Sequence, residues 1–333
     1  NGVYFYVRMS SSDSDQTWLY VLEELPSLLL VTLHCQQLLA WGHAWFTSVG
    51  NPAGLRPLVD TEGLSESEIS REHTVLVGRK PEKLQTVMDE IVQDGGSASF
   101  FVCDIRQEEV VKQTVAAIVA AHGRIDGLVN NAGGQYMTPL EAITAKGWEA
   151  VINTNLTGGF LMARECFLQS MNKNGGSIVN IVADMWGSMP GMGHSGAARA
   201  GMVSFTETAA IEWASKGVRV NAVAPGYIAS SGMDHYPEAM RPMLREMAKT
   251  IPLGRFGTEA ETSAGIVFLL SPAAAFISGS TLRIDGARPQ VRMGWPMRVA
   301  DAKAQERDSI KPFNGFHRAT TPKVFSTEEP KQP

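Results

Sequence analysis

GGSIVNIV at residues 175–182 and VRVNAVAPG at residues 218–226 are the two runs of sequence that decide the fold of this chain. Both are short, apolar and rich in β-branched residues, a pattern typical of buried strands. The residues between them have a helical pattern from about Ser195 to Ser215. A strand, a crossover helix and a second strand form the unit from which parallel sheets are built. The sequence therefore predicts an α/β fold with a parallel sheet.

The same alternation of strands and helices extends outward from this unit. Alternation of this kind predicts a doubly wound sheet with helices on both faces, here of about seven parallel strands. Further strands are expected at residues 74–77 and 97–102, and helices at residues 82–93, 108–122 and 148–171.

Length and composition favour one main domain with an extension at each end. The chain has 333 residues, of which 44% are hydrophobic, enough for a full core of about 250 residues. We expect an irregular N-terminal extension at residues 1–40, the α/β domain at residues 41–288 with a degenerate first strand–helix unit, and a partly disordered C-terminal extension at residues 289–333.

Charge and cysteine usage narrow the possible partners and the compartment. A formal net charge of −5 supplies no basic face for nucleic acid. Cys35, Cys103 and Cys166 lie in apolar surroundings without metal-type spacing, so we expect reduced, buried thiols and no metal site. This indicates an intracellular protein of the cytoplasm or an organelle matrix, and the terminal Lys-Gln-Pro is not a peroxisomal signal.

One N-terminal stretch is long enough to be considered as a membrane span. No Lys, Arg, Asp or Glu occurs between Pro26 and Leu55, and residues 28–46 are mostly apolar. A span needs about 20 apolar residues. However, His34 and His43 are among the polar residues that interrupt the run, so a buried or interfacial helix is favoured. The region also lacks the basic cluster of a signal peptide.

Four short motifs resemble those of the short-chain dehydrogenase/reductase family. They are DI at residues 104–105, NNAG at 130–133, NTNLTG at 153–158 and APGYI at 224–228. The resemblance covers roughly residues 73–288 and implies a Rossmann-like fold that binds a nicotinamide cofactor. It also implies that residues 259–270 form the last helix of that fold and residues 278–286 its last strand. It implies adenine contacts from Asp104 and Ile105, ribose contacts around Asn131, Ala132 and Gly133, and nicotinamide contacts from Pro225, Gly226 and Ile228.

The choice between the two nicotinamide cofactors depends on the end of the second predicted family strand. An acidic residue there binds the ribose hydroxyls of NAD, whereas Arg or Lys accommodates the 2′-phosphate of NADP. Here the chain reads Gly78-Arg79-Lys80. Taken alone this is also an ordinary basic loop, but in the family register Arg79 and Lys80 favour NADP(H).

The glycine-rich phosphate loop of the family is poorly matched. Gly50 and Gly54 have the spacing of two of its glycines, but Arg56 replaces the third and Pro52 removes a backbone donor. Three interpretations stay open. The segment is a divergent phosphate loop, a replacement in a protein that no longer binds nucleotide, or the product of a disrupted reading frame.

The catalytic residues of the family are altered. Its usual Tyr and Lys lie one helical turn apart, and the ammonium lowers the phenol pKa from about 10. Residues 194–199 instead read HSGAAR, which puts Ser195 at the tyrosine and Arg199 at the lysine, with His194 beside them. Asn155 matches the family's asparagine, which holds a water of a proton relay. Arg199 takes the lysine's contact with the nicotinamide ribose.

This altered block resembles the branch that contains the peroxisomal trans-2-enoyl-CoA and 2,4-dienoyl-CoA reductases. Reduction of a conjugated C=C bond needs donors for the enolate oxygen rather than a strong base. In the dienoyl group a tyrosine lies 15 residues before the helix lysine, and here that count leads to Asp184. Asp184 is thus a candidate proton donor if burial raises its pKa.

Less specific roles remain for these side chains. His194 is expected either at the active site or in a loop hydrogen bond, and Ser195 suits a helix N-cap. Arg199 in that case contacts a phosphate or an interface. Residues 229–256, which include four methionines, occupy the position of the family's substrate lid.

Three functions follow from these alternatives. The first is an NADP(H)-dependent oxidoreductase that reduces an enoyl- or dienoyl-CoA, with an acyl-CoA-like small molecule as substrate. The second is an impaired family member that acts as a scaffold subunit of a larger assembly. The third is an alcohol dehydrogenase for branched, terpenoid alcohols. Family habit predicts a homo-oligomer, a tetramer or dimer.

Overall fold

The computed structural model of the chain describes residues 2–11, 14–23, 73–93, 96–230, 233, 241–291, 298–307 and 309–313, with residues 2–23 described by their backbone. Cys35, the glycines Gly50 and Gly54, and the apolar run 28–46 lie outside the described residues. So do the predictions made for them.

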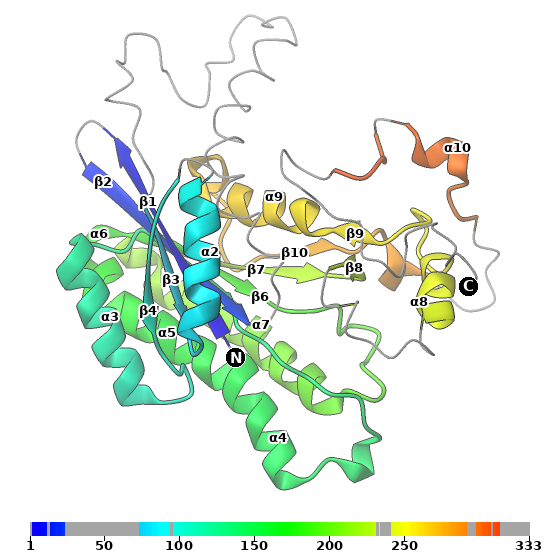
Figure 1. Cartoon of the computed structure of the whole chain (residues 1–333), viewed down its shortest axis with the longest axis horizontal. Coiled ribbons are helices and arrows are strands. Elements are labelled where there is room, and N and C mark those ends of the chain that lie inside the picture. Colours follow the sequence, from blue (N-terminus) through cyan, green and yellow to red (C-terminus); the bar gives the residue numbers. More distant parts are fainter. Residues whose placement is uncertain are drawn as a thin grey trace, which may run out of the picture.

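An eight-stranded sheet forms the centre of the molecule (Figure 1), in the order β10-β7-β6-β5-β2-β1-β3-β4. Apart from the first two strands of the chain, its strands all pair in parallel: β3 with β4, β5 with β6, β6 with β7, and β7 with β10. This confirms the predicted doubly wound sheet. These strands are β3 (His73–Gly78), β4 (Ser97–Val102), β5 (Gly127–Asn131), β6 (Gly176–Ile181), β7 (Val218–Pro225) and β10 (Thr281–Ile284).

A hairpin from the start of the chain fills the centre of this sheet. β2 (Ser14–Glu23) runs parallel to β5, and β1 (Gly2–Ser11) runs antiparallel to both β2 and β3. The predicted extension 1–40 thus contributes two strands to the sheet. Both runs are rich in the aromatic and β-branched residues typical of strands, a signal that was present in the sequence.

Helices cover both faces of the sheet. The predicted helix 148–171 is part of a longer path in which α4, α5 and α6 are joined by two π-helical turns, Asn153–Thr157 and Phe167–Met171. Gly123 ends α3 with a φ of +83° and donates to the Val119 carbonyl, as its position predicted. The helices are α2 (Pro81–Gln93), α3 (Glu108–His122), α4 (Ala145–Ile152), α5 (Gly158–Cys166), α6 (Asn172–Asn174), α7 (Gly193–Trp213), α8 (Arg241–Ala248), α9 (Glu259–Leu270) and α10 (Ala302–Gln305).

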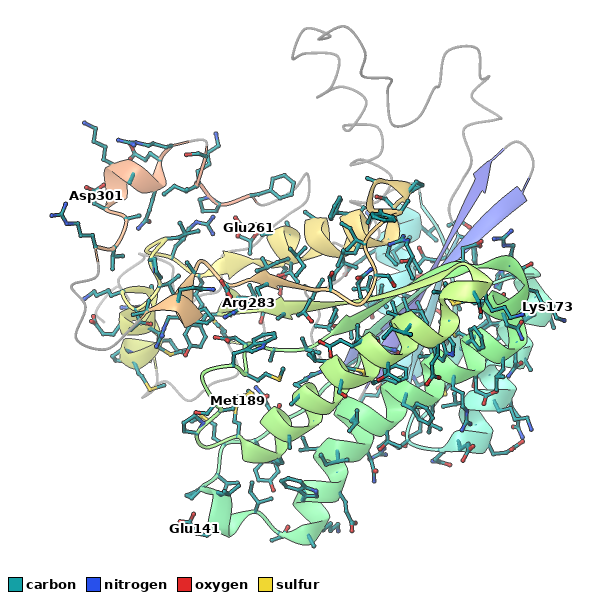
Figure 2. All side chains as sticks on the ribbon, turned by 180° about the vertical axis from the view of Figure 1, so that it is seen from behind. Glu141, Lys173, Met189, Glu261, Arg283 and Asp301 are labelled. Atoms are coloured by element: carbon teal, nitrogen blue, oxygen red, sulfur yellow. The ribbon has the colours of Figure 1, made fainter. Side chains whose placement is uncertain are left out.

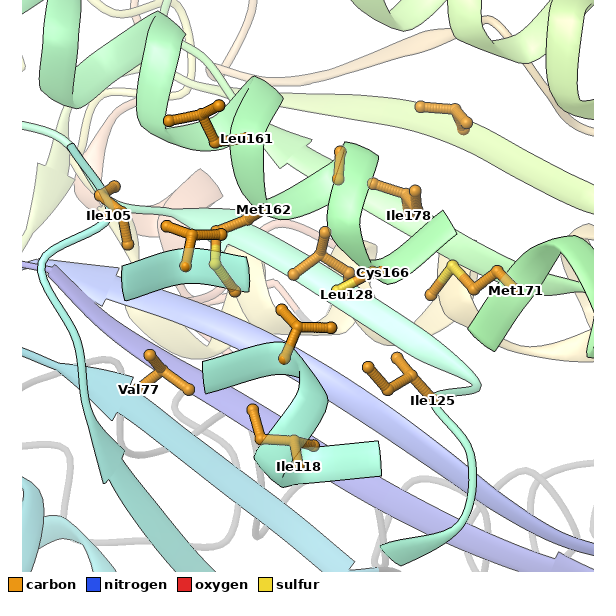
Figure 3. Packing of buried hydrophobic residues seen from close by; sticks show 14 of the residues in the cluster. Val77, Ile105, Ile118, Ile125, Leu128, Leu161, Met162, Cys166, Met171 and Ile178 are labelled. Carbon is orange, nitrogen blue, oxygen red and sulfur yellow. The ribbon is translucent and has the colours of Figure 1, made fainter. Parts of the chain in front are cut away.

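The core has one large cluster on each face of the sheet. α3, α5 and α7 pack on one face, where Ile118, Leu128 and Met162 are fully buried (Figure 3). α2 and α9 pack on the other face through residues such as Leu84 and Ile266. Both faces of the parallel strands are therefore covered by helices, as a parallel sheet requires.

The two described cysteines are free and buried, as predicted. Burial raises the pKa of the Cys103 thiol to about 11 and also raises the pKa of Cys166. Neither is a reactive thiolate at neutral pH. No described helix is long and apolar enough to cross a bilayer, and the described His, Cys, Asp and Glu side chains form no metal-binding group.

A buried polar chain links the middle strands to α7. Asn130 of β5 donates to the Asn180 side chain at 2.9 Å and to the Gly159 carbonyl at 3.1 Å. Asn180 of β6 donates in turn to the Thr206 hydroxyl of α7 at 2.8 Å. This chain sets the position of α7 relative to the ends of β5 and β6, where the candidate site lies.

Asn180→Ala should lower the free energy of unfolding by about 1–3 kcal/mol, because the buried side chains of Asn130 in β5 and Thr206 in α7 each lose one hydrogen-bond partner. Urea denaturation measures the change. Thr208→Ala, on the exposed side of α7, is the matched control and should change stability by less than about 0.5 kcal/mol. Equal effects of the two substitutions would contradict the role of the chain.

Candidate functional site

The candidate site lies at the carboxyl ends of β5, β6 and β7, the edge where open α/β sheets bind ligands. α7 begins beside this edge, so the side chains of its first two turns reach it. Ser195 is fully buried, and Arg199, one turn later, donates from Nη1 to the Ile181 carbonyl at the end of β6, at 2.7 Å. The predicted catalytic block is therefore placed at the strand ends.

Ser195 bonds across the site rather than to its own helix. Its hydroxyl donates to Oε1 of Gln135 at 2.8 Å. The residue at the N-cap of α7 is Met192, so the alternative role of Ser195 as an N-cap is wrong. The structure instead brings together a hydroxyl from α7 and an amide from the loop after β5.

Arg199 is a deeply placed cation. Burial lowers its pKa to about 10, which leaves it protonated at neutral pH. In the part of the chain that the structure describes, no carboxylate forms an ion pair with it. Gly133 lies against Nη2, and a Cβ on that glycine would overlap the guanidinium. A partly buried guanidinium next to the NNAG backbone fits a polar ligand group such as the hydroxyls of a ribose.

Asn155 fixes the loop that follows β5. It is buried within the π-helical turn of the long helix and bonds both backbone groups of Gly134. Oδ1 accepts from the Gly134 nitrogen at 2.7 Å, and Nδ2 donates to the Gly134 oxygen at 3.0 Å. The amide thereby positions the residue that follows, Gln135. The predicted role of Asn155 in a proton relay stays a prediction.

His194 is packed beneath an aromatic ring. It is fully buried, and Tyr136 meets it edge to face with the ring centroids 4.5 Å apart. Nδ1 accepts from the Ser195 backbone nitrogen at 3.0 Å. Nε2 has no hydrogen-bond partner within the described residues. A catalytic role for His194 stays a prediction.

Asp184 belongs to a neighbouring polar cluster toward β10. Burial raises the pKa of its carboxyl, opposed by the charge of Arg283. Nη2 of Arg283 lies 3.7 Å from Oδ1 of Asp184, Nε donates to Asp285 at 3.1 Å, and the guanidinium stacks 4.6 Å over the Trp186 ring. The raised pKa is the condition set for a proton donor, and that role of Asp184 stays a prediction.

The residues predicted to contact the adenosine half of the nicotinamide cofactor lie beside the start of α2. Arg79 follows β3, and its charge contributes to the lowered pKa of Asp104. Hydrogen bonds from Arg106 to Asp104, at 2.8 and 2.5 Å, are the main cause, and the pKa falls to about 2. The Lys80 carbonyl accepts from the Leu84 nitrogen in the first turn of α2. Two basic residues at a helix N-terminus fit a phosphate group.

Further predicted contacts lie at the ends of β4 and β7. Ile105 is buried against Gly158, and the Gly226 nitrogen donates to the Ile284 carbonyl at 2.9 Å. Asn131 and Ala132 lead from β5 to Gly133. Pro225 ends β7, and Ile228 begins β8 (Ile228–Ala229), a short strand paired with β9 (Gly257–Thr258).

Sequence reasoning missed Gln135 and Tyr136. Both directly follow the NNAGG run, and Gln135 is the first side chain after it that carries a hydrogen-bonding group. That position was the available signal. Its partner Ser195 is 60 residues away in the chain, so local patterns do not reveal the pair.

Comparisons with known proteins agree on one family. A family model described as enoyl-(acyl carrier protein) reductase matches residues 70–287. The chain is 38% identical over 220 residues to a probable 2,4-dienoyl-CoA reductase of Bacillus subtilis, covering 65% of this chain and 86% of that protein. It is 40% identical over 203 residues to a 3-oxoacyl-[acyl-carrier-protein] reductase of Synechocystis sp., covering 60% and 79%.

Among solved structures, a citronellol catabolism dehydrogenase of Pseudomonas aeruginosa is similar at 60% sequence identity and a TM-score of 0.57. The match covers 64% of this chain and 83% of that one. A short-chain dehydrogenase from Bacillus anthracis matches at 34% identity and a TM-score of 0.57, over 67% and 87% of the two chains.

Asn155→Ala should free the backbone of Gly134 and speed hydrogen exchange at its amide by at least about tenfold, because both bonds that hold the loop are lost. Exchange measured by NMR checks this. Thr154→Ala, whose hydroxyl bonds only within the exposed side of the same helix, is the matched control. Unchanged protection of Gly134 in the Asn155 variant would refute the clamp.

Proposed function

The chain belongs to the short-chain dehydrogenase/reductase family and is an oxidoreductase, and from this premise we propose that it uses NADPH to reduce the C=C bond of an enoyl or dienoyl thioester. The observation that carries the proposal is the bond from Ser195 to Gln135 beside a buried Arg199. These groups stand where the resemblance implies a phenol and an amine. The dienoyl-CoA reductase of Bacillus subtilis named above supports the same class of reaction.

The acid–base properties of these groups favour reduction of a C=C bond. Oxidation of an alcohol needs a base whose pKa lies near the working pH. A serine hydroxyl is a much weaker acid than a phenol, and Arg199 stays protonated because its pKa is about 10. Both groups are therefore suited to donate hydrogen bonds. A conjugated thioester needs such donors at its carbonyl oxygen, where negative charge develops during reduction.

Each side chain has a definite part in this proposal. The Ser195 hydroxyl turns from Gln135 to the substrate carbonyl, and the Gln135 amide nitrogen supplies a second donor. Arg199 binds the ribose hydroxyls and adds positive potential. A bound reduced nicotinamide supplies the hydride for the β-carbon. Asp184, whose pKa is raised, or a water then gives the proton to the α-carbon.

Basic residues at the end of β3 support NADP(H) over NAD(H). Arg79 and Lys80 flank the N-terminus of α2, and Arg79 lies close enough to Asp104 to lower its pKa. A 2′-phosphate placed there gains both the side-chain charges and the helix N-terminus. This position holds Arg79 and not the acidic residue that would select the free ribose hydroxyls of NAD.

Apolar side chains around the site suit an acyl chain. Tyr136, Met137 and Leu140 are exposed on the loop after β5, and Trp186 is exposed on the loop after β6. The two loops meet, because the Thr138 nitrogen donates to the Gly191 carbonyl at 2.8 Å. Exposed apolar residues grouped beside a polar site are typical of a ligand surface.

A second candidate has one specific observation in its favour. The 60% identity with the citronellol catabolism dehydrogenase supports a branched, terpenoid substrate, as an alcohol or as its acyl derivative. The alcohol requires a base that Ser195 and Arg199 do not supply. A branched acyl thioester satisfies both the chemistry of the site and the similarity.

Purified protein should oxidise NADPH in the presence of enoyl-CoA substrates, and more slowly with NADH. The absorbance of the reduced cofactor measures the rate with crotonyl-CoA, with longer chains and with a branched chain. No turnover with any of these would reject the proposal. NADP-dependent oxidation of citronellol would then favour the alcohol dehydrogenase, and failure to bind NADPH would favour the scaffold subunit.

Ser195→Ala and Gln135→Ala should each lower kcat by about 10²–10³-fold, because each removes a donor to the carbonyl oxygen. The dissociation constant of NADPH, measured by calorimetry, should stay within about twofold. Ser204→Ala, on the exposed face of α7, serves as the matched control and should leave kcat unchanged. A Ser195 variant with full kcat would assign the chemistry to other residues.

A further inference from the structure

The C-terminal strap, residues 298–307 and 309–313, lies outside the family match and packs on the segment before α9 (Figure 2, near Asp301 and Glu261). The Ala300 nitrogen donates to the Pro252 carbonyl at 3.0 Å, and Gln305 Nε2 donates to the Gly254 carbonyl at 3.2 Å. Gly254 has a φ of +73°, and a Cβ there would overlap the Ala300 carbonyl. The strap and this turn are therefore in close backbone contact.

Arg255 is the centre of the contact. Its Nε and Nη2 donate to the Ile310 carbonyl at 3.1 and 3.0 Å. Its Nη1 and Nη2 also donate to the Glu261 carboxylate, at 2.9 and 2.6 Å. Glu261 accepts in addition from the Phe313 nitrogen at 3.2 Å. The largely buried Arg255–Glu261 ion pair thus contacts the strap at two backbone groups, the Ile310 carbonyl and the Phe313 nitrogen.

Glu261 is held in its charged form. Burial acts to raise its pKa, but the hydrogen bonds from Arg255 and from the backbone nitrogens of Thr258 and Phe313 outweigh it and lower the pKa. The carboxylate is therefore ionised at neutral pH and accepts all of these bonds together.

Hydrogen bonds connect the Glu261 carboxylate, through β9, to the loop at the end of β7. Glu261 accepts from the Thr258 nitrogen at 2.8 Å as part of the capping box of α9, and Thr258 also donates to the Phe313 carbonyl. Thr258 belongs to β9, which pairs with β8. The neighbouring Gly257 nitrogen donates to the Tyr227 carbonyl at 2.9 Å, in the middle of the loop from Pro225 to Ile228.

We propose that the C-terminal strap positions the Pro225–Ile228 loop for the nicotinamide cofactor, with Arg255 and Glu261 as positioning residues. The inference rests on the proposed function, because it takes this loop as a cofactor contact. β8 and β9 pair over only two residues each, and so short a ladder is marginal by itself. The strap supplies the contacts that keep β9, and through it the loop, in place.

The test uses the full chain and three variants. Arg255→Gln removes the ion pair and the bonds to Ile310, and Gln305→Ala removes a bond from the strap to Gly254. Lys303→Gln is the matched control, because it removes one positive charge from an exposed position of α10 in the same strap. Calorimetry measures the dissociation constant of NADPH, and NMR measures hydrogen exchange at the Gly257 amide without cofactor.

Arg255→Gln should raise the dissociation constant about tenfold, and Gln305→Ala by a smaller factor in the same direction. Both should speed exchange at Gly257, and the control should change neither. Arg255→Lys, which keeps the charge but loses the forked donor geometry, should recover affinity only in part. If Arg255→Gln does not fold, Gln305→Ala and Arg255→Lys decide the outcome.

Two results would overturn the inference alone. Faster exchange at Gly257 with unchanged NADPH affinity would mean that the strap stabilises the loop without serving the cofactor. Unchanged exchange in every strap variant would mean that the strap does not hold the loop. If the unaltered chain binds no NADPH, the proposed function fails as well, which separates that failure from the other two.

Discussion

The site depends on the guanidinium of Arg199, which is removed from water and has no carboxylate partner among the described residues. Burying a charge costs several kcal/mol unless other groups compensate. For Arg199, the described structure supplies one carbonyl, that of Ile181, and close contact with Gly133. A ligand with matching hydrogen-bond acceptors would offset part of that cost. The position of Ser195 follows from it, because residues four apart share one face of a helix.

The other half of the site is a loop held by backbone bonds. Asn155 bonds both polar groups of the Gly134 backbone, and the π-helical turn around it offsets the helix where that contact occurs. Such turns are frequent at functional sites. The Gln135 amide and the Ser195 hydroxyl are consequently brought together by two helices. The long helix positions Gln135 through Asn155, and α7 carries Ser195. Rigid placement of donors is what makes them effective toward developing charge.

The parts of the fold that local patterns encode were predictable. The bounds of α9, residues 259–270, agree with those that the family resemblance implied, and Gly123 marked the end of α3. The hairpin at residues 2–23 had strand composition, but its antiparallel place inside a parallel sheet depends on long-range pairing that no local window contains. The ion pair of Asp104 with Arg106 joins residues two apart in the chain, and the family motif assigned Asp104 only to the adenine contact.

The sequence predicted most residues of the candidate site, but it did not predict most of the contacts between them. The chain of hydrogen bonds from the strap to the Pro225–Ile228 loop shows why, since most of these bonds end on a backbone nitrogen or carbonyl. Arg255 binds the carbonyl of Ile310, and Gly257 binds that of Tyr227. Every residue except proline offers the same backbone groups, so these contacts leave no signature in residue type. A segment beyond the family match can therefore contact the loops at the strand ends through groups that any residue would offer.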